Sequence, residues 1–450
     1  MRLRAIYGVV FCSLGISSQA ATIQETIIYP DAPVPLASFG KTMAKSGQTV
    51  VVGASSRNIP AAYYGSAYVF DMETGTQTYE LLPEDPVAHT YFGNDVAVEG
   101  STALVGAYRA TGSTRDSGAA YVFDLETGAQ KFKLTSDEAL GYDNFGVSVA
   151  LAGNTALVGA NEVWDGADGY SAGAVFLFDT TTGEQTGVLR QNDIDPYDRF
   201  GSDIVTYGNY ALIGTSGHDI AGQFAGAAYL FDIETQTQLV KITPDDAEEN
   251  SYFGNSLALS DRYAVIGAQR ADLGGHDRGA AYIFDFLTGE QIKLTAPDGE
   301  DQDFFGSSVA IFGDVVLVGA RYDSHFSPSS VGSVYAFDVM GNVLGKLYPS
   351  AAISGDSYGA KILFDLDAIL IGAPGDRTNG SKSGAVYAYT RAADAAPQAL
   401  SSAAPLNASS LLSLFTPIPS PAAVPLPASL WLLGAGVLGL SIRTRGLRAR

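Results

Sequence analysis

Histidines are the first candidates for metal or acid–base chemistry in this chain, which has only four of them. Three follow a repeated Gly-Ala or Gly-Thr phrase, and they are His218, His276 and His325. Three neighbouring imidazoles could bind a transition metal. However, these residues follow their phrases by 4, 9 and 6 residues, so their positions are not equivalent and exposed loop histidines are the better interpretation. His89 stands apart, and no Ser-His-Asp order or phosphate loop is present.

Acidic residues form a second candidate set, because they gather in a few polar segments. These segments contain Glu84-Asp85, Asp137-Glu138, Asp193 with Asp195, Asp245-Asp246 with Glu248-Glu249, and Asp298 with Glu300-Asp301 and Asp303. Carboxylates at such spacings could gather Ca²⁺, but none forms a recognised calcium-loop motif. A solvated acidic surface without a ligand is the alternative. We therefore predict no catalytic, cofactor-binding or metal-binding set, with Ca²⁺ as the one ion left open.

Three arginines follow Gly-Ala phrases closely, and they are Arg109, Arg270 and Arg321. They could face one central pocket and bind a ligand there. We instead expect them to pair with the neighbouring acids Asp116, Asp272 and Asp323.

A repeated phrase shows which elements carry these residues. Phe-Gly pairs begin at residues 39, 92, 145, 200, 253 and 305, and Tyr358-Gly359 is the seventh, at steps of 52 to 55 residues. Each pair is followed by an apolar run that ends in Gly-Ala, or in Gly-Thr at 214–215, and then by an aromatic-rich run that ends near an Asp. A fixed period of this length is typical of repeat architectures, in which no unit buries its apolar faces alone.

Each unit reads as four strands. In the second unit we expect strands at 92–98, 102–107, 119–124 and 130–135, separated by a short turn, a polar loop of about ten residues and a Leu-Glu-Thr-Gly turn. No part of residues 21–390 has a sustained helical period. Seven such units predict an all-β fold, a seven-bladed β-propeller of four-stranded blades.

The ends of the repeat array predict how the ring closes. The seventh unit stops at its third strand, at residues 385–389, whereas an unassigned strand precedes the first unit at residues 26–30. We expect this N-terminal strand to complete blade seven, which removes an exposed edge.

Both ends of the chain carry targeting segments. Residues 1–20 read as a signal peptide that is cleaved after Ala20, and Cys12 within it is the only cysteine. Residues 391–423, rich in Ala, Pro and Ser, read as a linker. The tail at 424–450 begins Val424-Pro425-Leu426-Pro427-Ala428, continues as a short apolar stretch to Ile442, and ends with Arg443, Arg445 and two more arginines. A permanent membrane anchor is the alternative, although the stretch is short against the ~20 residues needed to span.

The charge balance argues against two classes of partner. Without the arginines of the two terminal segments, 20 basic residues face 48 acidic ones. Such an excess of negative charge disfavours nucleic acid and anionic membranes and favours solubility outside the cell.

The repeated phrase resembles the FG-GAP repeats of integrin α-subunits and many bacterial surface proteins. The resemblance covers residues 23–390, and it implies a seven-bladed propeller used for binding, often in adhesion. Calcium loops of that family lie between the first and second strands. Here that connection is a short hairpin such as Ala152-Gly153-Asn154, so the family's metal sites do not carry over.

The tail resembles the PEP-CTERM sorting signal of Gram-negative bacteria. That resemblance implies that the tail is held in the inner membrane and is removed by an exosortase. Leu426 replaces the glutamate of the Pro-Glu-Pro motif, so the closer match is a Val-Pro-Leu-Pro-Ala variant.

These observations predict an exported protein at the cell surface or in the extracellular matrix, or one anchored in the inner membrane and facing the periplasm if its tail is kept. We expect a non-enzymatic module that binds a glycan or protein through its long loops. The alternative is a hydrolase or lyase that acts on extracellular polysaccharide at the mouth of the ring.

Overall fold

The structure is a computed structural model. It describes residues 23–391 apart from positions 57, 60, 61, 64, 164–170, 220–223, 272–275, 325–329 and 352. The signal peptide at 1–20, the linker from 392 onward and the tail at 424–450 therefore lie outside the described residues.

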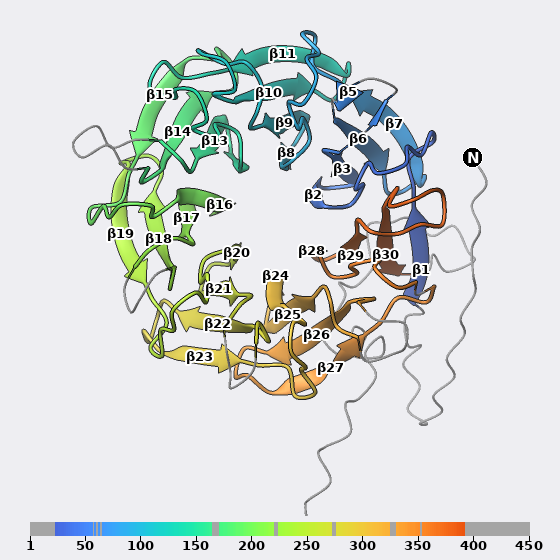
Figure 1. Ribbon diagram of the computed structural model, residues 1–450, viewed down its shortest axis with the longest axis vertical. Helices are drawn as coiled ribbons and strands as arrows, with labels where there is room; N and C mark the ends of the chain where they lie inside the picture. The colour runs from blue at the N-terminus through green and yellow to red at the C-terminus, as the bar shows by residue number, and fades with distance from the viewer. Residues whose placement is uncertain are drawn as a thin grey trace, which may run out of the picture. The chain divides into compact units, whose positions relative to one another are not determined.

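The described residues form a seven-bladed β-propeller, and no helix occurs among them. Each blade is a four-stranded antiparallel sheet. Figure 1 shows the sheets arranged in a ring, with strands such as β2, β8, β16 and β24 around the centre and β7, β11, β19 and β27 at the perimeter. The predicted fold class is confirmed.

The strands of the first four blades have the following bounds. Blade 1 contains β2 (Thr42–Ser46), β3 (Thr49–Ala54), β6 (Ser66–Asp71) and β7 (Thr76–Leu81), and its second loop carries the small hairpin β4 (Asn58–Ile59) and β5 (Ala62–Tyr63). Blade 2 contains β8 (Val96–Glu99), β9 (Thr102–Ala107), β10 (Ala119–Asp124) and β11 (Ala129–Leu134). Blade 3 contains β12 (Val149–Ala152), β13 (Thr155–Ala160), β14 (Ala174–Asp179) and β15 (Gln185–Leu189). Blade 4 contains β16 (Phe200–Tyr207), β17 (Tyr210–Thr215), β18 (Ala227–Asp232) and β19 (Thr237–Ile242).

The remaining blades follow the same order until the last. Blade 5 contains β20 (Ser256–Leu259), β21 (Tyr263–Ala268), β22 (Ala280–Asp285) and β23 (Gln291–Leu294). Blade 6 contains β24 (Phe305–Phe312), β25 (Val315–Ala320), β26 (Ser333–Asp338) and β27 (Val343–Leu347). Blade 7 contains β28 (Lys361–Phe364), β29 (Ala368–Ala373), β30 (Ala385–Arg391) and β1 (Ile23–Ile28).

The N-terminal strand closes the ring as expected. β1 pairs antiparallel with β30, from Ile23 opposite Arg391 to Ile28 opposite Val386. The strand lies a few residues earlier than the predicted 26–30. Between the other blades, the Phe of a Phe-Gly pair forms a parallel bridge to a Gly of the preceding blade, as Phe92 does with Gly65. Phe39 of blade 1 forms the same bridge to Gly384 of blade 7. Closure therefore uses the same inter-blade geometry as the rest of the propeller.

Each Phe-Gly pair joins one blade to the next. Phe145 is fully buried, and its ring packs against Phe176 and Phe178 of its own blade with centroids 5.4 and 5.9 Å apart. Its backbone bridges Gly118 of blade 2. A Cβ on Gly106, at the end of the second strand of blade 2, would lie 2.2 Å from the carbonyl oxygen of Gly146. The repeated glycines are thus required by backbone contact between blades, which is more specific than the crowding near the axis that the sequence suggests.

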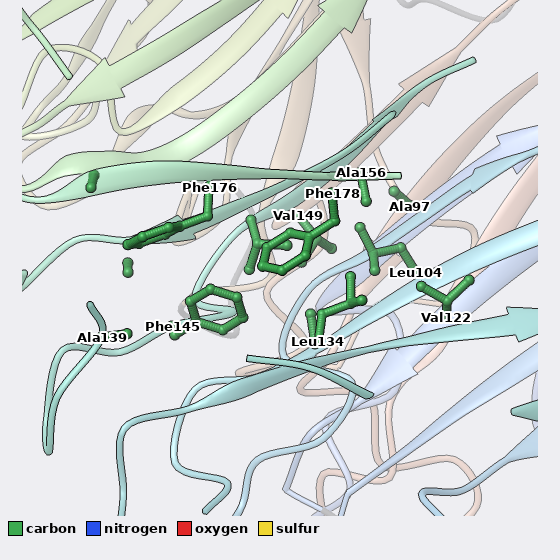
Figure 2. Packing of buried hydrophobic residues seen from close by; sticks show 14 of the residues in the cluster. Ala97, Leu104, Val122, Leu134, Ala139, Phe145, Val149, Ala156, Phe176 and Phe178 are labelled. Atoms are coloured by element: carbon green, nitrogen blue, oxygen red, sulfur yellow. The ribbon is translucent and has the colours of Figure 1, made fainter. Parts of the chain in front are cut away.

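The hydrophobic core lies between blades. Figure 2 shows the cluster shared by blades 2 and 3, where Leu104 and Val122 of one blade meet Val149 and Phe178 of the next. The second and third strands are buried on both faces, while the fourth alternates between exposed and partly buried residues. No blade can therefore bury its apolar surface without a neighbour.

The first strand of blade 2 is shorter than expected. We predict residues 92–98, but β8 begins at Val96. Gly93 has a φ of +79°, and Phe92 pairs with the previous blade instead of its own sheet. In blades 4 and 6 the strand does begin at the Phe, with an irregular register before Ile204 and Ser308.

The repeated Asp at the end of the third strand has the turn role that its position predicts. In blade 1, one oxygen of Asp71 accepts hydrogen bonds from the backbone N–H groups of Glu73 and Thr74, at 2.8 and 3.0 Å. Gly75 follows at a φ of +66°. These carboxylates are accordingly explained by turn structure.

Candidate ligand-binding face

The two faces of the propeller differ in loop length. The connections between first and second strands are hairpins of two or three residues, such as Gly100-Ser101 between β8 and β9. The connections between second and third strands, and those between blades, are longer and emerge on the opposite side. We call that side the long-loop face. Variable loops on a rigid scaffold are where binding residues usually lie.

Several acids of the long-loop face are held in a recurrent structural contact. In blade 5, Asp246 of the inter-blade loop accepts hydrogen bonds from the hydroxyl of Tyr282 at 2.9 Å and from Lys293 on the outermost strand. Burial alone would raise the pKa of Asp246, but these two hydrogen bonds outweigh it and the pKa is lowered. Equivalent Tyr–Asp–Lys contacts occur at Tyr121–Asp85–Lys133 and Tyr335–Asp298–Lys346. These acids fasten loops to the outer strands, so the acidic face is partly a structural feature.

His218 is buried, which corrects the expectation of an exposed loop histidine. Its Nδ1 lies 2.7 Å from a carboxylate oxygen of Asp198, and its Nε2 lies 2.8 Å from the ammonium of Lys241. Because an ammonium can only donate, Nε2 is the acceptor and the ring proton sits on Nδ1, where it is donated to Asp198. Burial raises the pKa of Asp198, although the bond from His218 opposes this.

Asp195, Asp198 and His218 are the described residues whose oxygen and nitrogen atoms come close enough together to hold a metal ion, within 4.8 Å of one another. The Lys241 ammonium already supplies a positive charge at this cluster. A hydrogen-bonded network therefore accounts for the geometry. Of the other histidines, His276 on blade 5 and His89 before blade 2 are exposed, as expected, and His325 lies outside the described residues.

The residue before each Phe-Gly pair adopts a left-handed backbone conformation. These seven residues have φ between 54° and 61°, and they are Ser38, Tyr91, Asn144, Arg199, Tyr252, Phe304 and Ser357. Non-glycine residues pay about 1–2 kcal/mol for this conformation, and Asn tolerates it better than bulky side chains do. Bulky aromatic residues at Tyr91, Tyr252 and Phe304 are thus unfavourable for local structure, which suggests a different reason for their presence.

A continuous chain of arginine and aromatic side chains crosses blades 4 to 6 on the long-loop face. We call it the arginine–aromatic arc, and it consists of Arg199, Phe224, Tyr252, Arg270, Phe304 and Arg321. The guanidinium of Arg199 lies 5.5 Å from the ring centroid of Phe224, which stacks on Tyr252 at 5.6 Å. Such cation–π contacts hold a guanidinium in place without neutralising its charge.

The arc continues through blades 5 and 6. Arg270 lies between the rings of Tyr252 and Phe304, at 5.3 and 5.8 Å. Arg321 then lies 5.5 Å from Phe304 and 5.1 Å from Tyr322. Three guanidinium groups and three aromatic rings thus form one surface that spans three blades.

Arg321 differs from the other arginines of the arc. Arg199 lies 3.4 Å from a carboxylate oxygen of Glu162, and Arg270 lies 3.9 Å from one of Asp277. Arg321 forms no ion pair with any described residue, and its Nε is buried without a hydrogen-bond partner. Burial, together with the nearby Arg270, lowers the pKa of Arg321.

The expected pairs Arg109–Asp116 and Arg321–Asp323 are wrong, whereas Arg270 does lie near a neighbouring acid. Arg109 contacts the rings of Tyr108 and Tyr142, at 5.8 and 5.5 Å, while Asp116 lies 3.5 Å from Arg115. Asp323 pairs with Lys346 at 2.6 Å. Asp272 lies outside the described residues, and Arg270 instead lies near Asp277.

Charged side chains also stand on or next to the innermost strands. Lys41, just before β2, is exposed, but the protein atoms crowded around it lower its pKa; Asp95 opposes this effect and Arg321 adds to it. Asp203 on blade 4 has a pKa raised to about 6 by burial, against the effect of Lys361 on blade 7. Both oxygens of Asp203 accept backbone N–H groups, from Ile204 and Leu257 at 3.1 and 2.9 Å.

The fold and this face define a seven-bladed propeller whose long loops present an arginine–aromatic surface. The FG-GAP repeat family matches residues 76–123, 129–178, 184–231, 236–284, 288–337 and 343–389. These segments cover more than half of the chain, so the protein belongs to the FG-GAP repeat family. A comparison with curated proteins finds no match.

The C-terminal residues 423–446 match the PEP-CTERM protein-sorting motif. This motif indicates an exported protein sorted to the cell envelope, and it implies membrane association and processing by an exosortase-type enzyme. Among the described residues, no helix is long and apolar enough to span a membrane. The apolar stretch at 428–442 lies outside them.

Sequence reasoning named two residues of the arc, Arg270 and Arg321, and missed Arg199 and the aromatic members Phe224, Tyr252 and Phe304. A signal for two of these was present, because Tyr252 and Phe304 occupy the position before a Phe-Gly pair. Comparison of that one position across the units would have shown bulky residues in some and Ser or Asn in others. Phe224, in contrast, stands in a loop that has no repeated pattern.

Proposed function

We propose that this protein is an exported cell-surface or matrix propeller that binds a glycan or protein through its long-loop face, without catalysing a reaction. The observation that carries the proposal is the arginine–aromatic arc. It places large side chains on a rigid scaffold at backbone positions where small ones would be easier to accommodate. Aromatic and arginine side chains also dominate binding energy at interfaces.

The proposed site differs from the purely acidic surface that the sequence indicates. The acids of the Tyr–Asp–Lys contacts engage the outermost strands, as Asp246 does with Lys293 of β23. The arc instead involves residues that directly precede the innermost strands, such as Phe304 before β24. Acids paired with lysines thus lie near the outer strands, whereas the residues of the arc lie nearer the inner strands.

The alternative is a hydrolase or lyase that acts on polysaccharide at the mouth of the ring. Asp203 is the axial carboxyl group with a raised pKa of about 6. However, both its oxygens are used to hold backbone amides of blades 4 and 5. This structural task favours a binding role over acid–base catalysis. Incubation with extracellular polysaccharides and measurement of new reducing or unsaturated ends tests the alternative directly.

A glycan array probed with the full-length protein in detergent tests the proposal. We expect binding to a subset of glycans, and we expect the double variant Arg199→Gln/Arg270→Gln to lose it. Lys131→Gln is a matched control, because this exposed residue lies on the outer strand β11, away from the arc. Glycan binding that survives in the double variant and is lost in the control would contradict the role of this face. An absence of both glycan and protein ligands for the long-loop face would refute the proposal.

We further propose that the tail is cut near Val424–Ala428, so that the mature protein lies outside the inner membrane. The order of a Pro-rich motif, a short apolar stretch and an arginine cluster supports this proposal. Mass spectrometry of C-terminal peptides from surface and medium fractions tests it. Intact Arg450 on the surface-exposed population, with all protein in the inner-membrane fraction, would show a permanent anchor instead.

A further inference from the structure

Two guanidinium groups of the arc, those of Arg270 and Arg321, lie 5.8 and 5.5 Å from the ring centroid of the same residue, Phe304. Burial and, after it, the charge of Arg270 lower the pKa of Arg321. The charge of Arg321 in turn adds to the desolvation that lowers the pKa of Lys41 on blade 1. Placing like charges together costs free energy unless a counter-charge is supplied. A carboxylate oxygen of Asp277 lies 3.9 Å from the guanidinium of Arg270, and the negative charge of Asp95 raises the pKa of Lys41. For Arg321, no described carboxylate supplies the counter-charge.

This local positive charge stands out because the whole chain carries a net charge of −22. Electrostatic screening limits the reach of that net charge to about 8–10 Å at physiological ionic strength. A ligand in contact with the arc therefore responds mainly to the nearby charges of Arg270, Arg321 and Asp277, and only weakly to acids on the distant rim. The buried Nε of Arg321 has no hydrogen-bond partner, so this donor is unsatisfied in the free protein.

We propose that the part of the arc around Phe304 binds the carboxylate groups of an acidic polysaccharide, with Arg321 and Arg270 holding carboxylates and the rings of Phe304 and Tyr252 packing on sugar faces. This inference rests on the proposed binding function of the long-loop face and names its ligand class. Arginine suits the task because its planar fork matches a carboxylate and also stacks on aromatic rings.

The alternation of the two side-chain types favours a polysaccharide over an acidic peptide. The guanidinium of Arg270 contacts two rings, and the ring of Phe304 contacts two guanidinium groups. A chain of uronic acids has the same alternation, because each unit offers an apolar ring face and one carboxylate. An acidic peptide has carboxylates on flexible side chains and no repeated flat face to pack on Tyr252 and Phe304.

Calorimetric titration of the full-length protein with oligogalacturonate tests the inference, with carboxyl-reduced oligogalacturonate and poly-glutamate as comparison probes. We expect saturable binding of oligogalacturonate, a loss of at least tenfold in affinity in Arg321→Gln and in Arg270→Gln, and much weaker binding of both comparison probes. Arg270→Gln keeps the test informative if Arg321→Gln does not fold, because the side chain of Arg270 is 47% exposed. Arg115→Gln is the control, since its side chain is 91% exposed and contacts Asp116 outside the arc.

The outcomes separate this inference from the broader proposal. Equal binding of the reduced and acidic sugars, or unchanged affinity in both arginine variants, would overturn a carboxylate site while leaving a glycan-binding face intact. Stronger binding of poly-glutamate would identify an acidic peptide and overturn the polysaccharide assignment. If oligogalacturonate does not bind while the array shows binding of other glycans, only the further inference fails.

Discussion

Removal of the closing strand is expected to destabilise the whole propeller. Deleting residues 21–31 from the full chain removes β1 and exposes the edge of β30. Ile28 is only 8% exposed, and Ile23 and Ile27 pack against the core between blades 6 and 7. Full burial of one isoleucine and partial burial of two contribute roughly 3–6 kcal/mol. That is a large part of the ~5–15 kcal/mol by which native proteins are stable.

The expected effect on melting follows from the size of the domain. For a propeller of about 370 residues, a loss of 3–6 kcal/mol corresponds to a fall of roughly 4–8 °C in Tm. The freed edge of β30 should also pair with other chains, so the variant should form dimers or aggregates in size-exclusion chromatography. A peptide of residues 21–31, added in excess, should restore both the Tm and the monomer.

Point variants separate the two contributions of β1 to stability, which are the burial of its isoleucines and the covering of the β30 edge. Replacing Ile23, Ile27 and Ile28 with Ala should lower the Tm while keeping the protein monomeric, because the backbone edge stays covered. Gln24→Ala/Thr26→Ala is the control on the same strand. A truncated protein that is monomeric and melts within about 1 °C of the full chain would refute the closure argument.

Three further predictions concern blade contact, pH and metal. Gly106→Ala should lower the free energy of unfolding by about 1–3 kcal/mol or more, because its Cβ would lie 2.2 Å from the carbonyl oxygen of Gly146. Gly141→Ala is the control, since its Cβ would lie 3.1 Å from the nearest atom and should cost less; chemical denaturation measures both. Burial raises the pKa of Asp356 to about 6, so its ionisation between about pH 4 and 6 destabilises the folded state. Asp356→Asn should therefore raise the free energy of unfolding at pH 7 by at most about 3 kcal/mol and have little effect at pH 4. An equal effect at both pH values would contradict this. Chelation of divalent cations should change the Tm by only a few °C, and a fall of more than about 10 °C would reveal cation sites in the acidic loops.

The architecture could be predicted from the sequence because the repeat encodes it many times. Small errors at one unit, such as the early start assigned to β8, do not affect the strand count. The closing strand was also predictable, since the last unit lacks a fourth strand and the chain before residue 39 supplies one. What the repeat could not show was the backbone at Phe92-Gly93, which leaves its own sheet to bridge the previous blade.

The candidate site was less predictable because it depends on contacts between units. Arg270 lies near Asp277 in sequence, and local reasoning favours such short-range pairs. Its contact with Phe304 arises only when blades 5 and 6 stand side by side, whereas Tyr252 belongs to the same unit as Arg270 and lies 18 residues before it. Burial of His218 also depends on residues distant in sequence, since Asp198 and Lys241 approach it from an inter-blade loop and the outer strand of blade 4.

An incomplete chain exposes open sheet edges, because each repeat unit spans parts of two blades. Each matched FG-GAP segment, such as 76–123, begins in the outer strand of one blade and ends in the third strand of the next. A chain interrupted before β30 therefore has two open edges at once, because β1 has no partner and the last blade made has no outer strand. Only the finished array joins Ile23 to Arg391. Ring closure thus marks a complete copy, because only then does every blade have its fourth strand and no open edge is left at the seam.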